Sequence, residues 1–74
     1  MPQKNYFYIE IVGGSNISYG YLKKMFYQHR KYQITSSPNA AKKYRTFEEA
    51  AADVDILVSF NISIRALIHN NMYA

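Results

Sequence analysis

Apolar and polar residues alternate near the N-terminus in the stretch NYFYIEIV, residues 5–12, and this pattern predicts a β-strand. Tyrosine and isoleucine favour strands, and the Gly-Gly pair that follows ends the element. Because side chains alternate between the two faces of a strand, Phe7, Ile9 and Ile11 share one face, which is the better core face. The opposite face carries Tyr6, Tyr8, Glu10 and Val12.

Two further strands are predicted over residues 19–28 and 32–35, with a polar turn at residues 29–31 between them. The longer strand alternates less cleanly, and its lysines indicate that one face meets water, as in many antiparallel sheets. The sequence SSPN then interrupts the pattern, because proline has no backbone N–H to donate to a neighbouring strand.

A helix is predicted over residues 47–58. Thr46 and Glu49 have the spacing of a capping box, and acidic residues in the first turn suit the helix dipole. The apolar stripe of this helix comprises Phe47, Ala50, Ala51, Val54, Leu57 and Val58. Its outer side comprises Glu48, Glu49, Ala52, Asp53 and Asp55.

The period changes to two at the end of this helix, which predicts a final strand over residues 61–69 and a frayed tail over residues 70–74. The β-branched isoleucines favour the strand. No glycine or proline forbids a continued helix, which would use Ile64, Leu67, Ile68 and Met72. We therefore predict one α+β domain, residues 1–74. It has a β-hairpin or three-stranded antiparallel meander, then one helix packed on one face, then a C-terminal strand.

The amino-acid composition excludes several kinds of site and predicts where the protein is located. No cysteine is present, so disulfides, thiolate zinc sites and cysteine nucleophiles are excluded. The N-terminal residues lack the pattern of a secretory signal, and no apolar stretch is long enough to span a membrane. These features predict a cytoplasmic protein. Residues 1–45 hold eight basic residues and one acidic residue, whereas residues 46–74 hold one basic and four acidic residues.

The stretch AKKYRTFEEA, residues 41–50, resembles a segment of small uncharacterised bacteriophage and prophage proteins. The matching positions are Ala41, Lys43, Tyr44, Thr46, Glu49 and Ala50. A glycine usually follows the helix in such proteins, and this sequence has none there. The resemblance implies an α+β fold and an accessory, non-catalytic role.

The residues that carry chemistry do not form the spacing of a known site. Gly13, Gly14 and Gly20 are not followed by the lysine of a phosphate-binding loop. His29 and His69 lie far apart, and neither has a metal-ligand pattern around it. We therefore expect no enzyme activity, no metal, no cofactor and no small-molecule ligand.

Aromatic and basic residues are interleaved in the first half of the chain, as in YLKKMFYQHRKY. Surfaces that bind single-stranded nucleic acid combine cations for phosphates with rings for base stacking. The candidate nucleic-acid or partner surface comprises Tyr21, Lys23, Lys24, Tyr27, Arg30, Lys31, Tyr32, Lys42, Lys43 and Arg45.

A protein-interaction or self-association module is the function that the sequence favours, with nucleic-acid binding as the alternative. One helix covers only one face of a sheet, so the face with Tyr6, Tyr8, Tyr21 and Tyr27 is expected to be exposed. A homodimer through Tyr6 and Tyr8, or through a strand edge, would enlarge the thin core of so short a chain.

Overall fold

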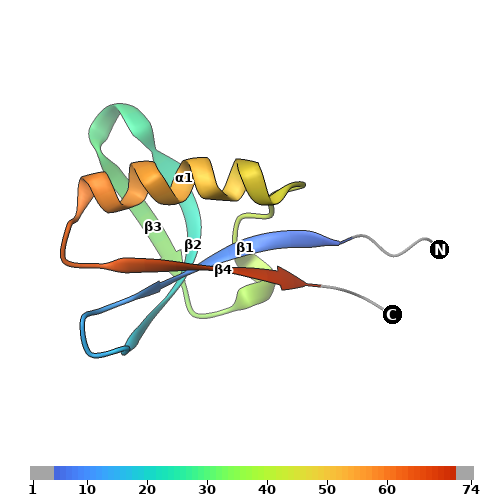
Figure 1. Cartoon of the computed structure of the whole chain (residues 1–74), viewed down its shortest axis with the longest axis horizontal. Helices are drawn as coiled ribbons and strands as arrows, with labels where there is room; N and C mark the ends of the chain where they lie inside the picture. Colours follow the sequence, from blue (N-terminus) through green and yellow to red (C-terminus); the bar gives the residue numbers. More distant parts are fainter. Residues whose placement is uncertain (1–4, 72–74) are drawn as a thin grey trace.

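The structure, a computed structural model, describes residues 5–71 of the chain. The elements follow in the order β1 (Tyr6–Val12), β2 (Ser18–Phe26), the 3-10 helix η1 (Tyr27–His29), β3 (Lys31–Thr35), the 3-10 helix η2 (Pro38–Ala40), α1 (Phe47–Phe60) and β4 (Arg65–Asn71). The strands form one four-stranded antiparallel sheet with the order β3-β2-β1-β4, and α1 lies across one face of it (Figure 1). The predicted α+β fold is confirmed.

The hydrophobic core lies between α1 and the sheet. Ile9 and Ile11 of β1 are fully buried, and Phe7 packs against the same cluster, so the predicted core face of β1 is confirmed. Leu22 of β2 and Leu57 of α1 complete the set of large, fully buried side chains in the described chain. Ala66 and Ile68 of β4 pack against this core from the edge of the sheet.

A β-bulge explains why β2 alternates poorly in the sequence. The register with β3 shifts between Leu22 and Lys24, so that Lys23 is an extra residue without a partner in β3. The bulge allows Leu22 and Met25, three positions apart, to reach the same core. The strand ends at Phe26, two residues before the predicted end, because Tyr27 begins the 3-10 helix.

The segment 42–44 lies between β1 and β2 at the point where these strands separate. Tyr44 donates its backbone N–H to the Phe7 carbonyl at 2.8 Å and accepts from the Phe7 N–H at 2.9 Å. On the other side, the backbone N–H of Lys42 donates to the Leu22 carbonyl at 2.8 Å. The segment therefore fills the divergence between the two central strands and has a fixed backbone.

The helix begins where the sequence predicts. Thr46 is the N-cap, and its hydroxyl accepts from the backbone N–H of Glu49 at 3.2 Å. The helix continues to Phe60, two residues beyond the predicted end. The prediction that Asp53 lies on the outer side of the helix is wrong: Asp53 is only 6% exposed and faces the body of the protein.

A turn at residues 61–64 separates α1 from β4. Asn61 accepts hydrogen bonds from the backbone and the hydroxyl of Ser63. The alternative of a continued helix is therefore wrong, and the final strand is confirmed, but it begins at Arg65 instead of residue 61. Residues 70 and 71 belong to the strand and not to a frayed tail, and residues 72–74 lie outside the described residues.

Candidate functional site

The face of the sheet turned away from α1 is here named the open face. Its members alternate along each strand with the residues that point toward the core, and the strand registers place them side by side. The open face comprises Tyr6, Tyr8 and Glu10 of β1, Tyr21, Lys24 and Phe26 of β2, Lys31, Gln33 and Thr35 of β3, and Leu67, His69 and Asn71 of β4.

Aromatic rings from three strands form a cluster on the open face. Tyr8 and His69 are cross-strand partners, and their ring centroids lie 5.1 Å apart with an interplanar angle of 23°. Tyr21 meets the Tyr8 ring at 5.6 Å in an edge-on arrangement, and Tyr6 lies 6.2 Å from Tyr8. All four side chains are of intermediate exposure, so the rings support one another and still reach the surface.

Glu10 lies beside the aromatic cluster and is the one acidic residue of the described chain on the open face. Its Oε1 is 2.8 Å from Nε2 of His69. Hydrogen bonds from the Ser18 and His69 side chains lower the pKa of the Glu10 carboxyl below its ordinary value.

Basic side chains surround the rings. The Lys24 ammonium lies 5.2 Å from the centroid of the Phe26 ring, and Lys31 stands opposite Phe26 on β3. Lys43, from the segment between β1 and β2, places its ammonium 5.3 Å from the centroid of the Tyr6 ring. The helix carries the acidic residues Glu48, Glu49, Asp53 and Asp55. Of the basic half of the sequence, Lys24, Lys31 and Lys43 lie on the side of the open face, whereas Arg30 and Lys42 lie toward the helix.

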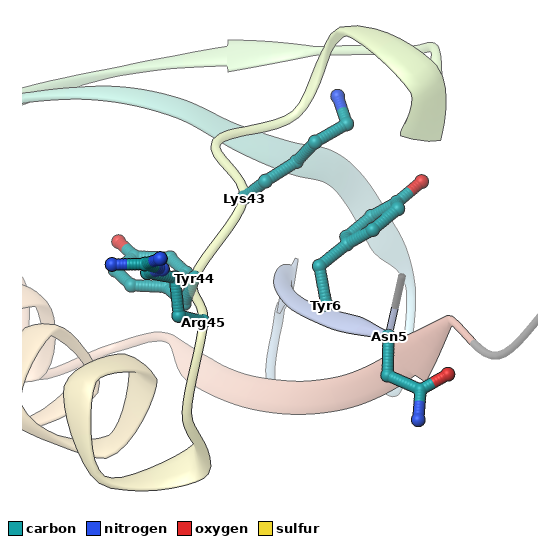
Figure 2. A pocket seen from close by; sticks show the side chains of 5 residues that line it. All are labelled: Asn5, Tyr6, Lys43, Tyr44 and Arg45. Carbon is teal, nitrogen blue, oxygen red and sulfur yellow. The ribbon is translucent and has the colours of Figure 1, made fainter. Parts of the chain in front are cut away.

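A shallow hollow of about 420 Å³ lies where β1 meets the segment 42–44 (Figure 2). It is lined by Asn5, Tyr6, Lys43, Tyr44 and Arg45. Figure 2 shows the side chains of Lys43 and Tyr6 extending in the same direction, which agrees with their cation–ring contact.

Several residues that were predicted to lie on the candidate surface instead form a polar network under α1. The Tyr27 hydroxyl donates to Oδ1 of Asp53 at 2.7 Å, and the Tyr44 hydroxyl donates to Oδ2. Lys42 completes the network with an ion pair to Oδ2 of Asp53 at 3.2 Å. The prediction that Tyr27 shares an exposed face with Tyr8 is therefore wrong. Tyr27 instead anchors η1 to the helix.

The pKa shifts of this network follow from its contacts. Burial opposes ionisation of Asp53, but hydrogen bonds from Tyr44, Tyr27 and Lys42 outweigh burial and lower the pKa of the carboxyl. Burial and the neighbouring carboxylate raise the pKa of both tyrosines. Burial opposes the charge on Lys42, but its bonds to Asp53 and Tyr27 outweigh that effect and raise the pKa of the amine. At neutral pH the network is a charged pair with two neutral phenols, which suits a structural anchor.

The structure divides the candidate surface residues between the two sides. Arg30 donates to the Ser59 carbonyl at 3.0 Å and lies over the Phe60 ring, at the C-terminal end of α1. Tyr32 packs against the core. Tyr27, Arg30, Tyr32 and Lys42 therefore lie toward the helix, whereas Tyr21, Lys24, Lys31 and Lys43 lie on or beside the open face. Lys23 is exposed in the bulge, and the Arg45 side chain extends away from Lys43 and Tyr6 (Figure 2).

The sequence analysis did not identify the roles of Asp53 and His69. The period of two in the last strand separates His69 from the core residues Ala66 and Ile68, and this signal could have placed it beside Tyr8. Asp53 lies three residues after Ala50 and four before Leu57, and this helical spacing could have placed it on the buried side of the helix.

Residues 5–71 contain neither a metal-binding cluster nor a membrane-spanning helix. In this part of the chain, no group of three or more histidine, cysteine, aspartate or glutamate side chains could hold a metal ion. None of the helices described is both long enough and apolar enough to cross a membrane.

Comparisons with protein-family models, with curated proteins and with solved structures give no match to this chain.

Proposed function

We propose that the open face binds single-stranded nucleic acid. The observation that carries the proposal is the division of charge in the fold. Lys24, Lys31 and Lys43 stand among aromatic rings on one side, whereas the carboxylates of α1 lie on the other. An extended anionic strand would meet cations and rings together on the open face and would be repelled by the helix side.

The chemistry of the face suits contacts that do not depend on base sequence. Lysine and arginine contact phosphates, and every base has a flat surface that can stack on an aromatic ring. Glu10, whose carboxylate is held in contact with His69, opposes phosphate binding on this face. We therefore expect weak binding with little preference for sequence and a strong dependence on salt.

Self-association through the same face is a second candidate, favoured by exposed apolar side chains. Leu67 is 46% exposed and Phe26 is 37% exposed, and both lie on the open face. Burial of such side chains against a second copy of the chain would remove apolar surface from water. The sequence-based prediction of a homodimer therefore stays a proposal, with Leu67 and Phe26 added to Tyr6 and Tyr8.

Fluorescence anisotropy with a labelled single-stranded oligonucleotide tests nucleic-acid binding. If four cations contact phosphates, the affinity should fall about 50-fold between roughly 50 and 200 mM salt. Lys31→Gln should weaken binding about fivefold at low salt. The matched control is Arg30→Gln, which removes the same charge from the helix side and should have a much smaller effect.

No binding at low salt would rule out the proposed function and leave self-association as the remaining proposal. Equal losses in Lys31→Gln and Arg30→Gln would show that net charge, and not the open face, determines binding. Thermal melting of both variants checks that each one is folded before their affinities are compared.

A further inference from the structure

The outer edge of β4 has no neighbouring strand in the described part of the chain, because β4 and β3 are the two ends of the sheet. The β3 edge has protective features, since β3 is only five residues long, begins at Lys31 and adjoins the bulge of β2. In contrast, β4 has seven residues and pairs with β1 without a bulge. It contains no proline, and its one lysine or arginine residue, Arg65, stands at its start. The β4 edge is therefore open to pairing with another strand.

The backbone groups that point out of the β4 edge follow from the pairing of β1. Phe7 exchanges two backbone hydrogen bonds with Tyr44, so its N–H and C=O point away from β4. Successive residues of a strand direct these groups to opposite sides, so Tyr8 directs its groups to its partner His69. Along β4, the residues that alternate with Leu67 and His69 therefore direct their N–H and C=O groups outward. These residues are Ala66, Ile68 and Asn70.

The flank of α1 above this edge is apolar. α1 runs alongside β4 in the opposite direction (Figure 1). Asp53 and Phe60 mark the flank that faces the β2–β3 hairpin, because they contact Tyr27 and Arg30. Since each residue of a helix turns by about 100°, the flank toward β4 consists of residues that carry no charge. They are Phe47, which is 52% exposed, and the half-buried Ala51, Val54 and Val58.

We infer that β4 pairs with β4 of a second copy of this chain, antiparallel and around a two-fold axis. When Ile68 lies opposite Ile68 of the second copy, Ala66 lies opposite Asn70, so all three outward-directed positions pair in both copies. The two four-stranded sheets then join into one continuous sheet. The three paired positions supply about six hydrogen bonds between the copies, because each hydrogen-bonded pair of an antiparallel ladder exchanges two.

A second copy fits this edge better than a single extended peptide does. A peptide would bond to the backbone of β4 but leave the apolar flank of α1 in water, whereas a second copy also brings its own α1 to cover that flank. On the open face, the register places Leu67, which is 46% exposed, opposite His69 of the second copy. Arg65 lies opposite Asn71, and Lys24 and Lys31 are on β2 and β3, away from the axis. The pairing therefore brings no like charges together.

Sedimentation equilibrium of the full chain measures the dimer, and amide hydrogen exchange locates it. The amides of Ala66, Ile68 and Asn70 should exchange more slowly as the protein concentration rises, whereas those of the β3 edge should not change. Asn70→Pro removes one outward N–H from each copy and leaves the hydrogen bonds between β4 and β1 in place. It should weaken the dimer about 30-fold, since two hydrogen bonds between the copies are lost.

A second pair of variants tests the helix flank without changing the strand. Ala51→Lys places an ammonium group from each copy at the interface and should weaken the dimer at least about tenfold. Ala52→Lys is the matched control, because it adds the same charge on the exposed side of α1 and should have little effect. This pair decides the question if Asn70→Pro does not fold, which thermal melting shows.

A chain that stays monomeric at about 1 mM would refute the inference. A dimer without slower exchange in β4, or one weakened equally by Ala51→Lys and Ala52→Lys, would refute it as well. The edge dimer should change little with salt, because its interface holds no like charges. A dimer that strengthens as salt rises would instead place the contact on the open face, where Lys24 and Lys31 lie.

Discussion

Asp53 shows how one buried charge organises the helix side of the molecule. Its carboxylate accepts from Tyr27, Tyr44 and Lys42, which come from η1 and from the segment that leads into α1. Since no side-chain N or O atom in the described chain is buried without a hydrogen-bond partner, the network satisfies the groups that it buries. The same carboxylate fixes the segment that carries Lys43 and Arg45.

Asp53→Asn should therefore destabilise the fold. The change leaves Lys42 without its charged partner and weakens the hydrogen bonds from the two phenols, at a cost of about 2 kcal/mol. For a domain of this size, that loss corresponds to a fall in Tm of about 10 °C. Thermal melting measures it, and Asp55→Asn is the matched control, because Asp55 is exposed on the same helix. Equal melting temperatures for the two variants would contradict the role assigned to Asp53.

Because the pKa of Asp53 is lowered, the stability that its carboxylate contributes also depends on pH. The folded state favours the carboxylate, so its stabilising effect is present above the ordinary pKa of 3.8. It is lost as the pH falls through the lowered pKa of the folded state. The wild-type protein should therefore lose more stability on acidification than Asp53→Asn, while Glu10 contributes a similar loss to both proteins. Parallel curves of stability against pH would exclude this account.

At the level of elements, the β2–β3 hairpin depends on a close approach at one glycine. Gly20 has a φ of +126°, and a Cβ built there would lie 2.8 Å from the backbone carbonyl oxygen of Thr35. An L-residue rarely adopts this backbone conformation, and β3 cannot move aside without breaking its register with β2.

Gly20→Ala should cost about 2 kcal/mol or more, from backbone strain together with the clash. Gly14→Ala is the matched control, since a Cβ there meets no atom within 4 Å. Chemical denaturation should separate the two variants clearly. A Gly20→Ala protein as stable as the wild type would show that β2 and β3 do not approach each other this closely.

Across the whole molecule, sequence reasoning worked where the pattern was local. The period of two in β1 identified its core face, and the spacing of Thr46 and Glu49 located the helix start. The bulge at Lys23 could not be predicted, because one inserted residue reverses the faces of the strand after it. The hydrogen bond between Asp53 and Tyr27 could not be predicted either, because Tyr27 is distant in sequence and is brought close only by the fold.

The division of charge across the molecule makes the two candidate functions respond to salt in opposite directions. Binding of single-stranded nucleic acid releases counterions and weakens as salt rises. Association of two open faces would place two faces that both carry Lys24 and Lys31 against each other, and salt would screen the repulsion between them. A face-to-face dimer should therefore strengthen with salt, and bound oligonucleotide should compete with it for the same surface.

Leu67→Ser provides the last prediction, because it changes the apolar part of the open face and leaves its cations in place. Leu67 is half exposed on the edge strand β4, so the substitution should lower self-association several-fold and change stability little. Oligonucleotide affinity should stay the same, since serine removes neither a cation nor a ring. Light scattering over a range of salt measures the first effect, and anisotropy measures the second. A dimer that weakens as salt rises, or that is insensitive to Leu67→Ser, would place the contact on another surface.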